Sequence, residues 1–242
     1  MKKSLFSLAA VAALALPAFA GLNMGDVQYN PALNGTGEIG SSGPCYTSGL
    51  PSWVNAQSLK NELVAPIQGI PGFSQFEGTV ESAVYYVNGV DASGGLGFTY
   101  RINLSGNSAP NLVRASLAAQ GWLSVNIFDA GSDGSGNTAA ATGNTTWTNG
   151  DPYFIERDAI AGNPQWTFRL GTDGTTINPN QSSALVWLET DAEIWRESAI
   201  SLLDGGAAGA ARILTVAIPS PAAAGLGMFG VAVLGAMRRR MS

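Results

Sequence analysis

The sequence predicts an all-β protein whose body is an antiparallel β-sandwich of about nine strands, with Greek-key or jelly-roll-like connections. Three observations predict this class. Short runs of β-branched and aromatic residues recur along the body, apolar and polar residues alternate within them, and Gly, Asn, Asp and Pro separate them. A closed barrel is the alternative. Helices are expected mainly at the two ends of the chain.

The clearest strand is expected at 96–105, where every second residue is apolar. This alternation predicts one face buried against a core and one face in water. A second run rich in β-branched and aromatic residues lies just before it, at 76–87. Further strands are expected at 111–118, 121–128, 153–158, 165–170, 184–190, 194–203 and 212–218.

The first twenty residues are typical of a secretory signal peptide. Two lysines follow the initial Met, an apolar run comes next, and Ala18 and Ala20 form an A-x-A cleavage site. This pattern predicts cleavage before Gly21, at the end of segment 1–20. The resulting chain would leave the cytoplasm through the Sec export machinery.

The next segment, 21–72, is rich in turn-forming Gly, Pro and Asn and has few apolar runs. We expect it to be loop-rich and to lie over the main β-sandwich domain, 73–218. A helical turn or two is expected within 52–64.

The C-terminal segment, 219–242, has the pattern of a membrane-inserted helix followed by a basic cluster. Residues 222–237 carry no charge and are followed at once by Arg238, Arg239 and Arg240. A helix of this length would span about 24 Å, a little short of the hydrocarbon core of about 30 Å. The three arginines favour the cytoplasmic side of the membrane, so everything before the helix is expected outside.

The same segment resembles the PEP-CTERM sorting signal, in which a short proline motif, an apolar helix and an arginine cluster follow one another. The motif here is Pro219, Ser220 and Pro221, a variant with Ser where the typical signal has Glu. The resemblance implies an exported bacterial protein whose tail is processed by an exosortase-type sorting enzyme. A looser resemblance to the secreted part of such proteins covers 76–85, 96–100, 183–191 and 203–206, and implies an exported β-rich domain.

Composition limits the classes of partner and chemistry. Between the two predicted signals the chain carries seven basic and seventeen acidic residues, a net charge of −10. This charge repels phosphate backbones, so no nucleic-acid partner is expected. The chain has no His, which excludes His-based triads and His-ligated zinc. The single Cys45 allows no internal disulfide and is expected to be buried or tolerated rather than paired with another chain.

One loop has partial calcium-ligand spacing. Asp129, Asp133 and Asn137 would be the oxygen ligands, but the third and twelfth positions of the loop are Gly131 and Ala140, where a calcium loop needs Asp or Asn and then Glu. A flexible loop without metal is the favoured interpretation, and no cofactor is expected unless calcium binds there.

Two further features suggest carbohydrate chemistry. Trp147 lies in a polar loop, where its ring could stack on a sugar, whereas Trp166 and Trp187 fall in alternating strands and are expected in the core. Five carboxylates could supply a pair for glycoside hydrolysis, although nothing in their spacing selects one. They are Glu156, Asp158, Glu189, Asp191 and Glu193.

These observations rank three functions. The first is a non-catalytic sandwich of the cell surface or extracellular matrix, such as an envelope or biofilm layer, held transiently at the inner membrane by 222–237. The second is a carbohydrate-binding module for extracellular polysaccharide. The third is a carboxylate-based glycosidase, which ranks last because no catalytic constellation is evident in the sequence.

Overall fold

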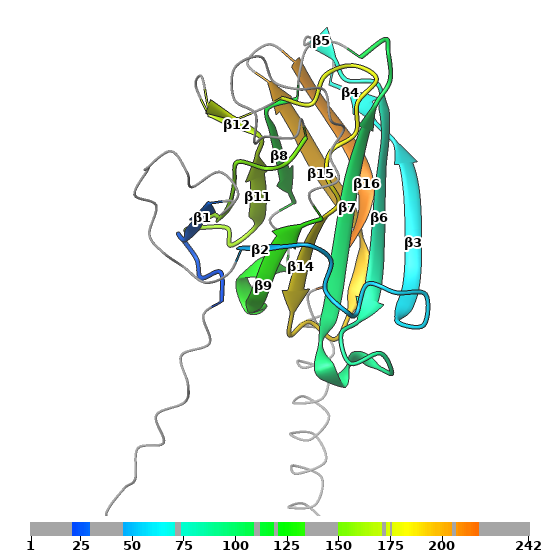
Figure 1. Ribbon diagram of the computed structural model, residues 1–242, viewed down its shortest axis with the longest axis vertical. Coiled ribbons are helices and arrows are strands. Elements are labelled where there is room, and N and C mark those ends of the chain that lie inside the picture. Colours follow the sequence, from blue (N-terminus) through cyan, green and yellow to red (C-terminus); the bar gives the residue numbers. More distant parts are fainter. Residues whose placement is uncertain are drawn as a thin grey trace, which may run out of the picture.

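The alternating runs of the body pair into two sheets that pack face to face (Figure 1). The computed structural model describes residues 21–29, 46–70, 74–108, 112–118, 121–133, 150–170, 173–174, 176–204 and 207–217. Within them the protein is all-β, and nearly all strand pairs are antiparallel, as the alternation predicts.

The first sheet has eight strands in the order β1-β10-β11-β8-β15-β16-β4, with β5 pairing parallel to β16. Its longest pair is the β15–β16 hairpin, which is in register from Trp195↔Val216 to Asp204↔Ala207. The strands are β1 (Val27–Tyr29), β4 (Gln68–Gly69), β5 (Ser74–Gln75), β8 (Arg114–Leu117), β10 (Phe154–Arg157), β11 (Pro164–Thr167), β15 (Trp195–Asp204) and β16 (Ala207–Val216).

The second sheet has six strands in the order β2-β9-β14-β7-β6-β3. Only its edge strand β2 runs parallel to its neighbour, β9. The strands are β2 (Tyr46–Ser48), β3 (Leu59–Pro66), β6 (Gly78–Tyr86), β7 (Leu96–Leu104), β9 (Ile127–Ser132) and β14 (Val186–Thr190). A separate two-stranded ribbon joins β12 (Arg169–Leu170) to β13 (Asp173–Gly174), and two 3-10 turns are η2 (Ala92–Gly94) and η3 (Trp122–Ser124).

The core lies between the two sheets and is centred on β7. Its five alternating apolar side chains, Leu96, Phe98, Tyr100, Ile102 and Leu104, are all at most 4% exposed. The Tyr100 ring lies 5.5 Å from the Trp166 ring of the first sheet, and its hydroxyl donates to the Leu214 carbonyl on β16 at 3.0 Å. Burial raises the pKa of the Tyr100 hydroxyl, so this group stays a neutral donor. The strand predicted most clearly from the sequence is therefore the centre of the fold.

The other face of β7 is not left in water, contrary to the expectation of one wet face. Trp53 lies across it, and a Cβ at Gly97 would meet the Trp53 ring at 2.4 Å. The ring is flanked by Tyr85 at 5.8 Å and by Trp187 at 5.9 Å, and Thr99 beside it is 2% exposed. A residue without a side chain at position 97 makes room for this second, smaller aromatic cluster.

The N-terminal segment is more regular than predicted. The helical turn expected within 52–64 is wrong over its second half, because β3 forms there and pairs with β6 from Leu59↔Tyr85 to Pro66↔Thr79. This strand sits at the sheet edge and five of its eight residues are exposed, which gives a weak periodic signal. The short strands β1, β2, β4 and β5 add further members to both sheets, so the strands exceed the expected nine.

Most of the other expected strands are present with shifted ends. The run predicted at 121–128 differs most, because its first half forms the 3-10 turn η3 and the strand β9 begins only at Ile127. Gly121 before this turn has a φ of +102°, a left-handed conformation that a strand cannot continue through.

The two predicted end helices lie outside the described residues. Within those residues, no helix is long and apolar enough to cross a bilayer.

Candidate interaction site

A buried arginine joins the N-terminal segment to the first sheet. Arg157 at the end of β10 is 6% exposed, and its guanidinium donates to four backbone carbonyls. Nε bonds Gly162 at 3.0 Å, one Nη bonds Leu22 at 3.0 Å, and the other bonds Trp122 and Val125, both at 2.6 Å. The planar fork of five N–H groups suits this task, because the acceptors come from three separate segments.

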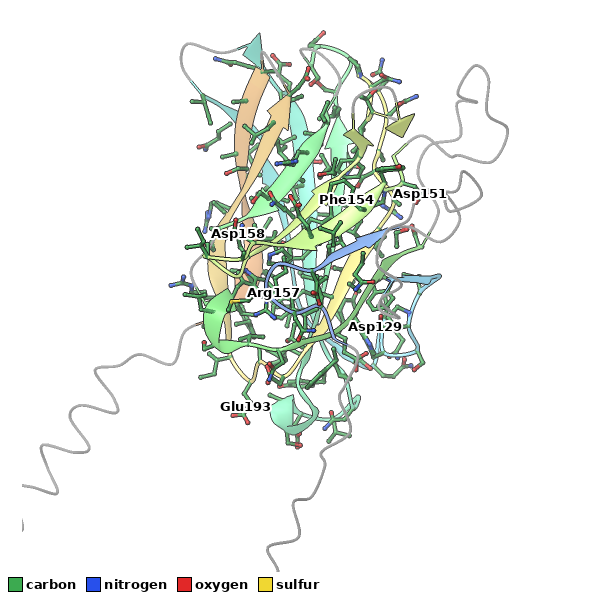
Figure 2. All side chains as sticks on the ribbon, turned by 90° about the vertical axis from the view of Figure 1, so that its left-hand side faces the viewer. Asp129, Asp151, Phe154, Arg157, Asp158 and Glu193 are labelled. Atoms are coloured by element: carbon green, nitrogen blue, oxygen red, sulfur yellow. The ribbon has the colours of Figure 1, made fainter. Side chains whose placement is uncertain are left out.

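No carboxylate bonds directly to this guanidinium among the described contacts. Burial lowers the pKa of Arg157, and the negative charges of Asp191 and Asp26 act in the opposite direction. Arg157 is therefore a charged group held by carbonyl dipoles, with its counter-charges at a distance. Figure 2 shows its side chain inside the molecule.

The turn after β10 is ordered by its own aspartate. Asp158 Oδ1 accepts from the amides of Ile160 at 2.8 Å and Ala161 at 2.6 Å, and these two bonds lower the pKa of the Asp158 carboxyl. Gly162 closes the turn at φ +70° and packs on Leu123, since an added Cβ would lie 3.2 Å from the Leu123 side chain. The turn is thus fixed against η3.

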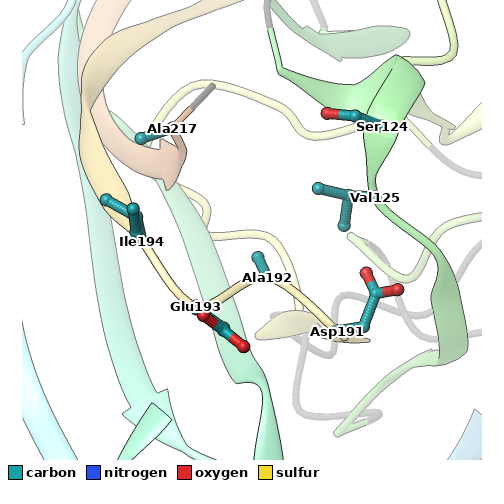
Figure 3. A pocket seen from close by; sticks show the side chains of 7 residues that line it. All are labelled: Ser124, Val125, Asp191, Ala192, Glu193, Ile194 and Ala217. Carbon is teal, nitrogen blue, oxygen red and sulfur yellow. The ribbon is translucent and has the colours of Figure 1, made fainter. Parts of the chain in front are cut away.

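A hollow of about 220 Å³, the tail-side hollow, lies where the chain leaves β16 (Figure 3). Asp191 on its wall accepts from the amide of Asn126 at 2.7 Å and from its side chain at 2.6 Å. Ala217 donates to the Ile194 carbonyl at 2.9 Å, which holds the last described residue on the opposite wall. The lining residues are Ser124, Val125, Asp191, Ala192, Glu193, Ile194 and Ala217.

A second hollow of about 210 Å³, the N-terminal hollow, lies beside the first described residue. Leu22 donates to the Ile127 carbonyl at 2.9 Å, and a Cβ on Gly21 would meet that same oxygen at 2.4 Å. The chain therefore passes too close to β9 for any side chain at position 21. The lining residues are Gly21, Leu22, Asn23, Asn126, Ile127, Phe128 and Arg157.

The two hollows share one wall, the segment 122–128. Its residues Ser124 and Val125 face the tail-side hollow, and Asn126, Ile127 and Phe128 face the N-terminal hollow. The first and last described residues of the chain, Gly21 and Ala217, thus each line a hollow that this short segment also lines. We consider this end of the sandwich the candidate interaction site.

Of the residues predicted for processing, Gly21 is described and lies in the N-terminal hollow. The other predicted site residues that fall outside the described parts are Ala18, Ala20, Asn137, Trp147, Pro219, Ser220, Pro221, Arg238, Arg239 and Arg240, together with Cys45. Their predictions stand as made.

The two described members of the predicted calcium loop do not converge. Asp129 is on β9 and Asp133 follows it four residues later, about 13 Å along an extended strand. Asp133 accepts from Arg101 at 3.1 Å and from the Leu185 amide at 2.8 Å, whereas the register places Asp129 opposite Glu189. Within the described residues no three Asp, Glu or Cys side chains form a group that could hold a metal ion.

The five carboxylates considered for glycoside hydrolysis are dispersed, and most have structural partners. Asp158 caps its turn, and the pKa shift of its carboxyl is opposite to that of a general acid. Figure 2 places Asp158 and Glu193 well apart. Asp191 and Glu193 share the tail-side hollow, but the Asp191 carboxylate is occupied by Asn126. The remaining partners are Arg114, 3.9 Å from Glu156, and Trp53, whose Nε1 donates to Glu189 at 2.9 Å.

The described tryptophans serve packing. Trp166 and Trp187 are each 1% exposed, which confirms that they belong to the interior. Trp53 and Trp122 are also buried, and Trp195 is partly buried. No fully exposed tryptophan platform for a sugar ring is present in the parts of the chain that the structure describes.

Arg157 is the residue that sequence reasoning missed. It lies in the run predicted as a strand at 153–158, where a single Arg beside Glu156 and Asp158 resembles an ordinary solvent-facing charge. The only local signal is its position shortly after the strongly apolar Phe154 and Ile155.

No protein-family model, no curated protein and no solved structure matches this chain.

Proposed function

We propose that this chain is an exported bacterial protein of the cell surface or extracellular matrix. Its role is structural or interactive and non-catalytic, and its C-terminal segment sorts it. The observation that supports this proposal is the position of the folded body relative to the two predicted signals. Strand β1 begins six residues after Gly21, and β16 ends at Val216, three residues before Pro219. The sandwich therefore fits the stretch that both processing events would leave.

The partners follow from the same proposal. The Sec machinery exports the chain, the helix 222–237 holds it in the inner membrane, and an exosortase-type enzyme acts at the variant Pro219-Ser220-Pro221 motif. The net charge of −10 between the signals suits solubility outside the cell and disfavours nucleic acid.

One observation supports a non-catalytic role. Four of the five candidate carboxylates bond or pair with side chains or backbone amides that have structural roles. The connections also alternate between the two sheets, as from β7 to β8 and from β8 to β9, which supports a jelly-roll-like interpretation of the sandwich. This architecture carries many unrelated functions, so it does not itself select a ligand.

Intact-mass measurement of the protein recovered from the cell surface and the medium tests the proposal. We expect a chain that begins at Gly21 and whose C-terminus is shortened near Pro219. A variant with Pro219→Ala and Pro221→Ala should remain uncut and membrane-bound, while Pro179→Ala, in a loop of the sandwich, is the matched control. Recovery of the full 242-residue chain from the cytosol would overturn the proposal.

The alternatives have distinct outcomes. Glycan binding that disappears in Trp147→Ala would make the protein a carbohydrate-binding module. Polysaccharide cleavage that disappears after a single carboxylate change, such as Glu193→Gln, would make it a glycosidase.

A further inference from the structure

Exposed apolar side chains gather around the point where the chain leaves the sandwich. Leu123 is 61% exposed, Ile160 is 88% exposed and Ile194 is 51% exposed. We call these three residues the exit patch.

One contact and one hollow relate the members of the exit patch. Gly162 packs against Leu123, so the turn that carries Ile160 lies on η3. The residues that follow Leu123 line the tail-side hollow with Ile194 and Ala217, as Figure 3 shows. Single large apolar residues are common on protein surfaces, but a group of them marks a surface that contacts a membrane or another molecule.

Met24 extends the exit patch on the side of the N-terminal hollow. It is 49% exposed, and the next residue, Gly25, lies against Ala159 in the same turn as Ile160. Large apolar side chains are thus exposed near both described ends of the chain.

The length of chain beyond Ala217 limits what can cover this surface. Only residues 218–221 separate Ala217 from the predicted membrane helix 222–237. Fully extended, the five steps from Ala217 to Ala222 reach at most about 18 Å. A sandwich tethered so closely must present the surface around Ala217 to the bilayer, whose interface accepts apolar side chains to a depth of about 5–10 Å.

We propose that the exit patch rests on the bilayer surface while the C-terminal helix is inserted. This inference rests on the proposed function, because it requires the helix to be in the membrane. The patch orients the sandwich with its Ala217 end toward the membrane, and it carries the predicted cleavage points before Gly21 and at Pro219 to the side where membrane-bound processing enzymes act.

The charged side chains near the exit patch determine which lipid headgroups it can contact. Asp191 and Glu193 line the tail-side hollow beside Ile194, and Asp158 lies two residues before Ile160. The described cations near these residues are the buried Arg157 and the partly exposed Arg196, two residues after Ile194, so exposed acidic side chains outnumber exposed basic ones here. The pKa of Asp158 is held below its ordinary value by its amide bonds, so its charge persists at neutral pH. The patch therefore suits a zwitterionic surface, and added anionic lipid should weaken the contact.

Site-specific fluorescence on the full-length chain tests the proposal. In a Cys45→Ser background, an environment-sensitive probe is attached at Ile160→Cys or at Leu203→Cys. Leu203 is a matched control because it is exposed at 42% and lies at the far end of β15, about 27 Å from Trp195. Each protein is reconstituted into phosphatidylcholine nanodiscs, with and without a quencher attached to the lipid, and insertion is checked by co-migration with lipid.

We expect a blue-shifted emission and strong lipid quenching at position 160, and water-like emission without quenching at 203. Replacing one third of the phosphatidylcholine by phosphatidylglycerol should reduce the quenching at 160. Equal signals at both positions in an inserted chain would overturn the patch proposal and leave the anchor intact. A chain that does not co-migrate with lipid would overturn both. A concentration-dependent blue shift without lipid would identify a second copy as the occupant and also refute the proposal.

Discussion

Replacing Arg157 by Met removes the donors that hold three segments together. Four carbonyl oxygens, those of Leu22, Trp122, Val125 and Gly162, would each lose a hydrogen bond inside a buried site. A buried acceptor left without a donor costs about 1–3 kcal/mol.

The same change also removes a buried charge, which partly offsets the loss. Taking a charged group out of water costs several kcal/mol even after relaxation, and Met is of similar length and apolar. The four lost bonds together cost about 4–12 kcal/mol, and after subtracting an offset of several kcal/mol we expect a net destabilisation of about 3 kcal/mol. This is a large part of the about 5–15 kcal/mol that stabilises a typical domain.

The assay is urea unfolding of the full-length protein at neutral pH, followed by tryptophan fluorescence. Trp122 carries one of the affected carbonyls and is 0% exposed, so it contributes to the change in emission together with the other five tryptophans. Arg157→Lys should give an intermediate value, because an ammonium group cannot reach acceptors on all three segments at once.

Arg212→Met is the control. Arg212 is exposed on β16 and pairs with Glu197 across the β15–β16 hairpin, a surface ion pair expected to contribute less than about 1 kcal/mol. If Arg157→Met and Arg212→Met are equally mild, the buried arginine does not organise this end of the sandwich and the reasoning fails.

Three further predictions concern the sandwich itself. Gly97→Ala should lower the free energy of unfolding in urea by about 1–3 kcal/mol, because the added methyl group pushes against the Trp53 ring. In a chain that already carries Trp53→Ala, the same change should cost less; equal costs in the two backgrounds would contradict the contact. Tyr100→Phe should cost about 1–3 kcal/mol by leaving the buried Leu214 carbonyl without its donor, and a change near zero would show that another donor replaces it. Asp158→Asn should flatten the acid limb of the stability curve. The pKa of the Asp158 carboxyl is lower in the folded chain than its ordinary value of 3.8. The carboxylate therefore stabilises the fold above pH 3.8, and this stabilisation disappears as the pH falls through the folded-state pKa. Wild-type and variant curves of unfolding free energy that stay parallel between about pH 5 and pH 2 would refute this.

The interior of the fold could be predicted because its signal is local. Strand β7 alternates along its whole length, and a period of two is enough to identify a strand and its buried side. The covering of its outer face was not predictable from the same pattern. Gly97 and Thr99 resemble solvent-facing positions, but both are buried, and Gly97 is covered by Trp53 from a segment over forty residues earlier.

The candidate site was less predictable for a related reason. The partners of Arg157 are backbone carbonyls, which every residue carries, so no residue type marks them in the sequence. Leu22 and Trp122 become acceptors only because the chain brings them together across 135 and 35 positions. The carboxylate Asp191, which sequence reasoning considered for catalysis, instead binds Asn126 on the same shared wall.

The arrangement at this end also bears on how the two predicted signals can act on one folded body. Gly21 lies against Ile127, and Ala217 lines the tail-side hollow with Ser124 and Val125 of the same segment, 122–128. Arg157 fixes that segment through Trp122 and Val125. If the sandwich had its chain ends at opposite poles, a helix inserted beyond residue 221 would hold the N-terminal cleavage point far from the membrane. With both ends on one short wall, a membrane-facing orientation set at Ala217 also sets the position of Gly21. The buried arginine, through carbonyls that no sequence pattern marks, therefore couples the geometry of the two ends.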